Sequence, residues 1–225
     1  SKWLNNELTL VDAPHVVEHY LAILKPLGIE SPAVRFALPE RDAERQFAEQ
    51  LIARCGLEPR RVACLNPGAG WPSKLWPAER YGAVARALAQ RWQLGSLAVW
   101  GDAREMSLAQ AIVASSGEQA ALAPATSLRQ LAVARRARLF VGSDTGPLHL
   151  AVAVGTPSIS LHGASRAAWC GAYGPQNRRL QAVYVAGTAR QRRTADNRAM
   201  QAISVEMVLE ACSEMLGQDV VRRCG

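Results

Sequence analysis

The sequence predicts an α/β fold, a Rossmann-like parallel sheet with helices on both faces. Short apolar runs alternate with longer helical patterns from residue 61 onward. Residues typical of helix N-termini follow these apolar runs. Examples are Pro77, at a first helical position, and Asp102, as an N-cap. No internal repeat interrupts the alternation. Such sheets bind ligands beyond the carboxyl ends of their strands, so we expect functional residues in the loops that follow each strand.

The expected strands are short and apolar, and in chain order they lie at 61–66, 96–101, 120–125, 138–143, 157–163 and 178–186. The expected helices carry apolar residues at helical spacing, and they lie at 76–92, 102–115, 127–137, 145–155 and 203–217. Ser127 is a candidate cap for the third of these helices. The last helix is amphipathic and closes the alternating region.

The first part of the chain does not follow this alternation. Residues 12–25 predict a helix with Asp12 as N-cap, and residues 30–39, with two prolines, predict a linker. A second helix is expected at about 40–55. At roughly 150 residues per domain, 225 residues fit one large domain or one domain and part of another.

The composition is that of a globular protein, since 49% of the residues are hydrophobic and 20% are charged. No apolar run approaches the roughly 20 residues of a membrane-spanning helix, and the first residues lack the features of a signal peptide. The five cysteines are odd in number and have no C-x-x-C spacing. They argue against a disulfide framework and a zinc site, and favour a reducing compartment. The histidines are too scattered to predict a metal cluster.

The net charge of +7 is partly local, because six arginines and one acid lie between Arg178 and Arg198. A basic strip of this kind can meet nucleic acid, anionic lipid or an acidic substrate. A solvated loop is the simpler interpretation. We favour it over a nucleic-acid site because Tyr184 is the one aromatic residue among these arginines.

The loop after the first strand predicts a phosphate site. It contains Gly68 and Gly70, which let backbone N–H groups approach an anion, and Lys74, which adds positive charge. The loop matches neither G-x-x-x-x-G-K-[ST] nor G-x-G-x-x-G, so an ordinary turn is the alternative. In the loop after the second strand, Asp102 and Glu105 form a capping box or supply a carboxylate that binds ribose hydroxyls.

The loop after the fourth strand opens a helix, whose N-terminal N–H groups make an anion site. Ser143 or Asp144 is the expected N-cap. Because a carboxylate repels a diphosphate, Asp144 suits sugar hydroxyls or capping. Thr145 and His149 share a helical face, and His149 is a structural residue or a catalyst. A further loop over 162–174 carries glycines and aromatic residues that suit a pocket edge or an ordinary connection.

Taken in order, these loops resemble glycosyltransferase family 9, the lipopolysaccharide heptosyltransferases. The resemblance covers about residues 61–216, and it includes NPGAG…SKLWP, WGDAREMS, SDTGPLHLA followed by G-x-P, and GAYG. It implies a two-domain GT-B architecture of which this chain is the carboxyl-terminal half. Residues 1–39 would be the tail of an amino-terminal acceptor domain with a linker, and residues 40–225 the donor-nucleotide-binding domain.

The resemblance also implies the roles of the residues that contact phosphate and sugar. Lys74 would neutralise the donor diphosphate and stabilise the leaving nucleoside diphosphate, which makes it the catalytic candidate. Thr145 and Gly146 would present helix N-terminal groups to the same phosphates. Asp144 would hold the transferred sugar, and His149 matches the motif with a role that could be structural.

Three more residues would bind the nucleoside. Glu105 would bind the ribose, and Thr126 and Ser127 would lie beside the nucleobase. The sequence departs from the family pattern at Ala69 and Gly70, where related chains often have hydroxyl residues. Backbone N–H groups would have to replace those hydroxyl contacts.

The function that the resemblance implies is transfer of a sugar, heptose from ADP-heptose, to a lipopolysaccharide core or a similar lipid-linked acceptor. Transfer would invert the anomeric centre, with no cofactor, no essential metal and no nucleic-acid partner. The enzyme would be cytoplasmic, peripheral on the inner face of the cytoplasmic membrane. Independently of the resemblance, the basic residues at 178–198 are a candidate contact for anionic lipid or a phosphorylated acceptor. The acceptor pocket and general base belong to the amino-terminal half, so we expect this chain alone to bind donor without transfer.

Three other functions stay open at this point. A nicotinamide-dependent Rossmann oxidoreductase would need G-x-G-x-x-G, but here Gly68-Ala69-Gly70-Trp71 is followed by proline. A nucleic-acid-binding module would explain the pI of about 9.6. A sugar-nucleotide-binding module without catalysis would share the donor site and lack turnover.

Overall fold

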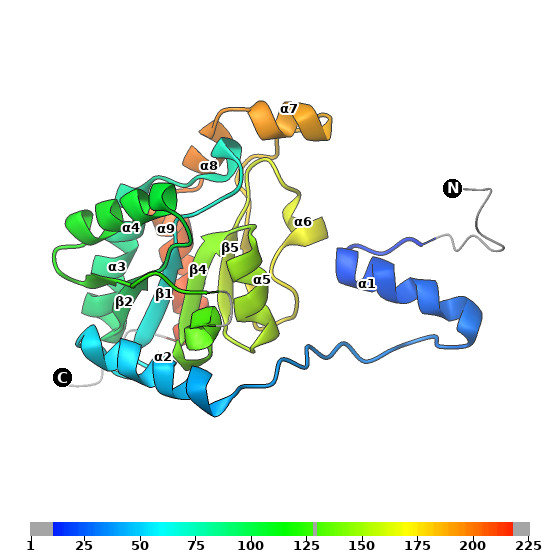
Figure 1. Cartoon of the computed structure of the whole chain (residues 1–225). Coiled ribbons are helices and arrows are strands. Elements are labelled where there is room, and N and C mark those ends of the chain that lie inside the picture. The colour runs from blue at the N-terminus through cyan, green and yellow to red at the C-terminus, as the bar shows by residue number, and fades with distance from the viewer. Residues whose placement is uncertain (1–10, 128–129, 218–225) are drawn as a thin grey trace.

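A computed structural model describes residues 11–127 and 130–217, with the side chains of 130–132 left out. It contains a six-stranded sheet, in the order β3-β2-β1-β4-β5-β6, in which every neighbouring pair is parallel. The strands are β1 Val62–Asn66, β2 Gly95–Ala98, β3 Ala120–Leu122, β4 Leu139–Ser143, β5 Ser158–Leu161 and β6 Arg178–Leu180. Figure 1 shows this sheet between two layers of helices. The predicted fold class is therefore confirmed.

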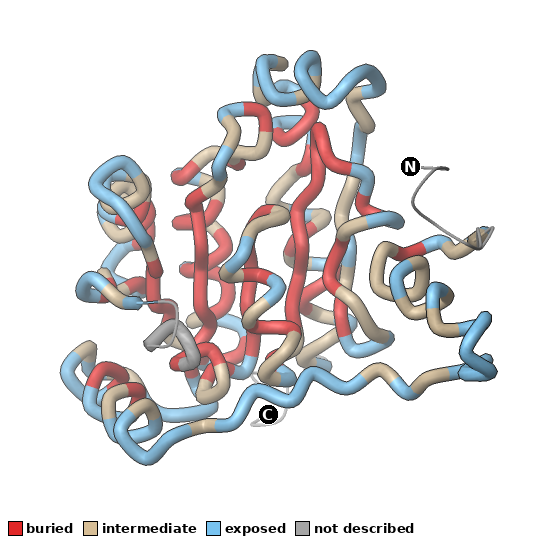
Figure 2. The backbone as a smooth tube through the Cα atoms, turned by 45° about the vertical axis from the view of Figure 1, so that its right-hand side comes forward, coloured by how far each residue is buried: buried red, intermediate tan, exposed pale blue. Residues whose placement is uncertain are grey.

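One helical layer consists of α3 Ala78–Trp92, α4 Ala103–Ser115 and α9 Val205–Leu216. Their apolar side chains pack with Leu65, Val141 and Ile159 of the sheet. The other layer contains α2 Asp42–Arg54, the 3₁₀ helix η3 Gln130–Arg136 and α5 Gly146–Ala153. Because both faces are covered, every residue of β1 and β4 is buried, as parallel sheets require (Figure 2).

Most of the predicted elements are shorter than expected, and two of them differ for a reason that the contacts show. The helix predicted at 127–137 is the 3₁₀ helix η3, which packs against both α2 and α5; residues 128 and 129 of that prediction lie outside the described residues. The strand predicted at 178–186 ends at Leu180. The next side chain, Gln181, turns to the neighbouring loop and donates to the carbonyl oxygens of Gly163 and Ser165. These contacts take the chain out of the sheet.

The amino-terminal segment begins with α1 Val16–Leu21 and continues as the 3₁₀ helix η1 Ala22–Leu27. The prediction of Asp12 as N-cap is wrong. The cap is His15, whose Nδ1 accepts from the N–H of Val17 at 3.2 Å. The reason lies in Pro14, because the residue before a proline is held in an extended conformation and a helix can begin only after it.

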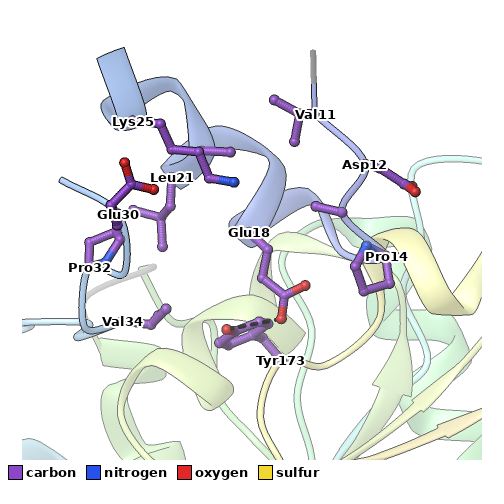
Figure 3. Close-up of a pocket in the computed structure, with 12 residues that line it drawn as sticks. Val11, Asp12, Pro14, Glu18, Leu21, Lys25, Glu30, Pro32, Val34 and Tyr173 are labelled. Atoms are coloured by element: carbon purple, nitrogen blue, oxygen red, sulfur yellow. Dashed lines mark hydrogen bonds between the residues drawn. The ribbon is translucent and has the colours of Figure 1, made fainter. Parts of the chain in front are cut away.

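This segment touches the sheet domain through a few contacts. His15 Nε2 lies 3.0 Å from the carbonyl oxygen of Gly171, and Tyr173 donates to Glu18 at 3.4 Å. Figure 3 shows the Glu18 carboxylate next to the Tyr173 hydroxyl. Both residues line a hollow of about 290 Å³. Outside it the segment exposes large apolar side chains, namely Tyr20, Ile23, Leu27, Ile29, Phe36 and Leu38. Three of these, Tyr20, Ile23 and Leu27, belong to α1 and η1. The domain division at residue 39 stays a prediction.

Four short helices complete the described part of the chain, and they are η2 Pro72–Lys74, α6 Ala167–Cys170, α7 Ala189–Thr194 and α8 Arg198–Gln201. Two hydrogen bonds fix η2 against the carboxyl-terminal region. Buried Trp76 donates to the carbonyl oxygen of Ile203 at 2.9 Å, and Asn197 donates to that of Leu75 at 3.1 Å. The described residues contain no helix that is long and apolar enough to cross a membrane.

The contact between α3 and α4 depends on Gly82, because a Cβ there would overlap the Ser115 side chain. Alanine normally stabilises a helix interior by about 0.5–1 kcal/mol relative to glycine. We expect the opposite for Gly82→Ala, a loss of about 1–3 kcal/mol in the free energy of unfolding, since overpacking costs that much. Urea unfolding measures it. Gly70→Ala is the matched control, because nothing lies within 4 Å of its Cβ position. A stabilised Gly82→Ala would contradict the packing.

Candidate functional site

The sheet order reverses direction between β1 and β4, which is the position where open α/β sheets bind ligands. The loops that leave the carboxyl ends of β1, β2, β4 and β5 all meet at this edge. They carry Lys74, Glu105, Asp144 and His162. The structure therefore gathers the loops that the sequence singled out.

Asn66, at the end of β1, joins two of these loops. Its Nδ2 donates to Thr145 Oγ1 at 3.3 Å, and its Oδ1 accepts from the N–H of Gly68 at 3.2 Å. Tyr81 donates to its backbone carbonyl at 3.1 Å. The sequence reasoning gave Asn66 no role. A buried polar residue at the end of an otherwise apolar strand was the available signal.

Lys74 lies on η2 and is held by three groups. Its Nζ donates to Asp144 Oδ2 at 2.7 Å and to the Asp144 carbonyl oxygen at 3.1 Å. It also lies 4.3 Å from the centre of the Trp71 ring. The Ser143 hydroxyl donates to the backbone carbonyl of Lys74 at 2.6 Å. The phosphate lysine and the sugar aspartate implied by the family resemblance are thus direct partners here.

Asp144 is held as a carboxylate. Its side chain is 12% exposed, and this burial alone would raise its pKa. Hydrogen bonds from His149, at 3.1 Å, and from Lys74, together with the Lys74 charge, outweigh burial and hold the pKa of Asp144 well below its usual range. An ionised carboxylate only accepts hydrogen bonds, so Asp144 can bind hydroxyl groups and is a poor general base.

His162 and Cys170 lie behind Asp144. Nitrogen, oxygen and sulfur atoms of these three residues lie within 4.8 Å of one another, the one such group that could hold a metal ion among the described residues. Burial, opposed by the Asp144 charge, lowers the pKa of His162 to about 4, and its Nε2 has no hydrogen-bond partner in the described structure. Burial and Asp144 raise the pKa of Cys170 to about 11. The Lys74 ammonium already contacts the same carboxylate.

The amino-terminal end of α5 has no side-chain cap. Its N-cap is Thr145, so the prediction of Ser143 or Asp144 as cap is wrong. Ser143 donates to the Lys74 carbonyl instead, and the Asp144 carboxylate binds Lys74 and His149. Pro147 has no N–H, so the first turn offers an anion the N–H groups of Gly146 and Leu148, which no side chain caps.

Glu105 lies at the start of α4. Asp102 caps this helix, accepting from the N–H of Glu105 at 2.8 Å, as predicted. The Glu105 carboxylate turns back and accepts from the N–H of Gly101 at 2.8 Å. A Cβ on Gly68 would overlap this carboxyl group. A larger residue at Gly68 would therefore require the end of the Glu105 side chain to move, where the loops after β1 and β2 approach each other.

Two cavities border these residues. One, of about 200 Å³, is lined by Asn66, Val99, Trp100, Gly101, Glu105, Thr126, Ser127 and Pro147. The other, of about 390 Å³, is lined by Trp71, Lys74, Asp144, Ala164, Ser165, Arg166, Trp169, Cys170, Tyr184 and Arg192. Asn66 links them, because it lines the first and bonds to Thr145, the neighbour of Asp144.

The structure thus places the eight predicted site residues in two groups. Glu105, Thr126 and Ser127 share the smaller cavity. The other group gathers around the start of α5 and consists of Lys74, Asp144, Thr145, Gly146 and His149. Trp71 and His162 are additional neighbours that the sequence reasoning left without a role. The loop 162–174 lines the larger cavity, as one of its two interpretations required.

The family model described as glycosyltransferase family 9 (heptosyltransferase) matches residues 1–200. The chain belongs to glycosyltransferase family 9. It is 35% identical to lipopolysaccharide heptosyltransferase 1 of Pseudomonas aeruginosa over 130 residues, 53% of this chain and 36% of the relative. It is 30% identical to lipopolysaccharide heptosyltransferase 3 of Escherichia coli over 154 residues, 67% of this chain and 45% of the relative.

Solved structures of the family share the fold. A family 9 glycosyltransferase from Veillonella parvula superposes with a TM-score of 0.72 at 23% identity, over 92% of this chain and 62% of that one. E. coli heptosyltransferase WaaC with ADP gives a TM-score of 0.66 at 19% identity, over 93% and 60% of the two chains. The chain spans less than half the length of the two curated relatives above.

The buried His162 makes stability depend on pH. Its pKa falls from 6.5 to about 4 on folding. At a pH between these two values, His162 is therefore protonated in the unfolded chain and neutral in the folded protein. The contribution of His162 to stability is therefore fully present above pH 6.5 and is lost as pH falls towards 4. At 1.36 kcal/mol per pKa unit this contribution is about 3 kcal/mol.

Urea unfolding at several pH values between 4 and 7 measures this slope. His162→Gln should be less stable at neutral pH and should lose most of the slope, because glutamine does not titrate. An unchanged slope in His162→Gln would show that another group is responsible.

Proposed function

We propose that this chain forms the donor-binding part of a heptosyltransferase, which transfers heptose from ADP-heptose to a lipopolysaccharide core acceptor. The observation that carries the proposal is the pairing of Lys74 with Asp144 beside the uncapped start of α5. A cation and free backbone N–H groups bind a diphosphate, and a carboxylate accepts hydrogen bonds from the hydroxyl groups of the sugar joined to it.

The smaller cavity suits the nucleoside. The Glu105 carboxylate accepts hydrogen bonds, and the two ribose hydroxyls can donate to it. Thr126 and Ser127 line the same cavity with Val99 and Trp100, a mixture of hydroxyl and apolar groups that suits a base. From this cavity the diphosphate would reach Lys74 and the N–H group of Gly146 past Asn66.

The chemical step is a displacement at the anomeric carbon. An acceptor hydroxyl oxygen forms the new bond, and its proton passes to the general base expected in the amino-terminal half. The bond from the anomeric carbon to the phosphate oxygen breaks, and ADP leaves with that electron pair. Negative charge grows on the diphosphate during this step. Lys74 and the α5 N–H groups stabilise that charge, which makes Lys74 the catalytic residue of this half. A single displacement inverts the anomeric centre.

Asp144 holds the sugar in this scheme. As a carboxylate it accepts from sugar hydroxyls, and its bonds to Lys74 and His149 fix its orientation. His149 is then a positioning residue. We propose that no metal or other cofactor is required, because the Lys74 ammonium already neutralises the carboxylate that a metal ion would share with His162 and Cys170.

The similar proteins support the donor and the acceptor. The relatives named above are lipopolysaccharide heptosyltransferases, and one E. coli homologue is described with ADP and with ADP-2-deoxy-2-fluoro heptose. We propose accordingly that the protein works in the cytoplasm, at the inner face of the membrane where a lipid-linked acceptor is found.

The first test is calorimetric titration with ADP, UDP, GDP and NAD. We expect ADP to bind most tightly and Lys74→Ala to weaken it at least about tenfold, since a hydrogen bond to a charged group contributes about 1.5–3 kcal/mol. Losing the ammonium also leaves Asp144 to repel the diphosphate.

Lys25→Ala is the control, because Lys25 is exposed on η1, away from both cavities. Addition of EDTA should leave ADP binding unchanged. A well-folded protein that binds NAD and no nucleoside diphosphate would support the oxidoreductase alternative and refute the proposal.

The second test distinguishes contacts to the donor sugar from contacts to the nucleotide. Asp144→Asn keeps the shape of the side chain and removes its charge. We expect it to bind ADP as tightly as the native protein or more tightly, because repulsion of the diphosphate is relieved. The additional affinity for ADP-heptose over ADP should fall at least about fivefold, since a charged acceptor is lost. Equal losses for both ligands would mean that Asp144 does not contact the sugar.

A further inference from the structure

One histidine anchors the amino-terminal segment, residues 11–39, to the sheet domain. His15 is 3% exposed, and it is the one buried residue between positions 11 and 39. Burial lowers the pKa of His15, so its ring is uncharged at neutral pH. A buried imidazole on an otherwise exposed segment indicates that this side chain has a specific place against the domain.

Both ring nitrogens of His15 have partners. Nδ1 accepts from the backbone N–H of Val17 at 3.2 Å, and Nε2 lies 3.0 Å from the carbonyl oxygen of Gly171. A carbonyl oxygen only accepts, so the proton of the neutral ring is on Nε2. The ring therefore caps α1 with one nitrogen and holds the sheet domain with the other.

Two further pairs of side chains join the segment to the same part of the domain. Glu18 accepts from the Tyr173 hydroxyl at 3.4 Å (Figure 3). The His19 ring lies edge-on to the Trp169 ring, with 5.2 Å between their centres. Together with the histidine bond above, these contacts hold residues 169–173, which we call the anchored turn.

The anchored turn is also attached to the sheet. The N–H of Ala172 donates to the Ser160 hydroxyl in β5 at 3.2 Å, and Asn177 donates to the Tyr173 carbonyl oxygen at 2.6 Å. These two bonds fix the carboxyl-terminal end of the turn. The contacts from the amino-terminal segment instead reach its beginning and its middle.

The same turn forms part of the wall of the larger cavity. Trp169 and Cys170 line this cavity together with Asp144. The Cys170 thiol donates to Asp144 Oδ2 at 3.4 Å. Gly171, whose carbonyl oxygen contacts His15, is the next residue in the chain. Because the peptide unit between them is planar and stiff, a displacement of Gly171 also displaces Cys170.

We propose that His15 is a positioning residue for the donor sugar. Its bond to Gly171 holds the anchored turn where Trp169 and Cys170 complete the wall beside Asp144. His15 thus affects the sugar half of the donor and leaves the nucleotide half unchanged. The sugar as the ligand of this wall rests on the proposed function, whereas the dependence of Trp169 on His15 rests on the contacts alone.

Two substitutions separate the capping of α1 from the positioning of the turn. Asparagine places an amide oxygen near the position of Nδ1 and is a good N-cap, but it is too short to reach Gly171. Glutamine places an amide nitrogen near the position of Nε2 and can still donate to Gly171. His15→Asn therefore keeps the cap and loses the bond, while His15→Gln keeps the bond and weakens the cap.

The first measurement is the NMR signal of the Trp169 indole N–H in the protein without ligand, assigned by its absence in Trp169→Phe. We expect the signal to shift in His15→Asn and to stay near its native position in His15→Gln. Ile23→Asn is the matched control, because Ile23 is 56% exposed on η1, and it should leave the signal in place.

Two outcomes of this measurement would overturn the proposal. An unmoved signal in His15→Asn would show that the Gly171 bond does not position the turn. Equal shifts in His15→Asn and His15→Gln, or in Ile23→Asn, would show a general loosening of the segment.

The second measurement is calorimetric titration with ADP and ADP-heptose. We expect ADP to bind the His15 variants as tightly as it binds the native protein. The additional affinity for ADP-heptose over ADP should fall at least about threefold in His15→Asn, since one hydrogen bond contributes about fivefold to an equilibrium constant. His15→Gln should regain it.

An unchanged preference for ADP-heptose in His15→Asn would overturn the positioning role, and so would a parallel loss of ADP affinity, which indicates a merely structural residue. Failure of the proposed function gives a different result. A protein that binds neither ligand, but whose Trp169 signal follows the Gly171 bond, would refute the proposed function and uphold the link between His15 and Trp169.

Discussion

The pairing of Lys74 with Asp144 is the interaction on which the site depends. Both side chains are nearly out of solvent, at 13% and 12% exposure, and either one alone would leave a buried charge uncompensated. A buried ion pair adds little net stability, so its value here lies in placing two opposite charges next to each other. The pair joins the loop after β1 to the loop after β4 at the reversal of strand order.

The surrounding contacts keep this pair in one geometry. Ser143 holds the backbone of Lys74, Asn66 bridges to Thr145, and Trp71 covers the ammonium group. Each of these groups comes from a strand end or from the loop directly after it. The sheet thus sets the positions of the Lys74 and Asp144 charges, because the residues that hold them lie within a few positions of the strand ends.

Much of the fold followed from local patterns. Apolar runs and helical patterns alternate along the sequence, and Asp102 marks the start of α4. Pro77 is the N-cap of α3 and not its first helical residue, one position from the prediction. The rule for parallel sheets located the edge of the sheet that carries the site. Asp12 was misassigned because Pro14 was not weighed. The contact of Lys74 with Asp144 could not be read from local sequence, since 70 residues separate the two. The basic strip at 178–198 is likewise split by partners such as Glu214, which pairs with Arg178 from far along the chain.

The missing side-chain cap of α5 has a consequence for the stability of this helix when no ligand is bound. A side-chain cap contributes about 1 kcal/mol to a helix, and the caps of α4 and α9 are Asp102 and Ser204. Helix α5, which Thr145 starts without such a bond, forgoes that contribution. An anion at its first turn would supply the missing bonds, so the ligand completes a secondary-structure element as well as occupying a site. The helix next to the reacting groups would then be the one that tightens when substrate arrives.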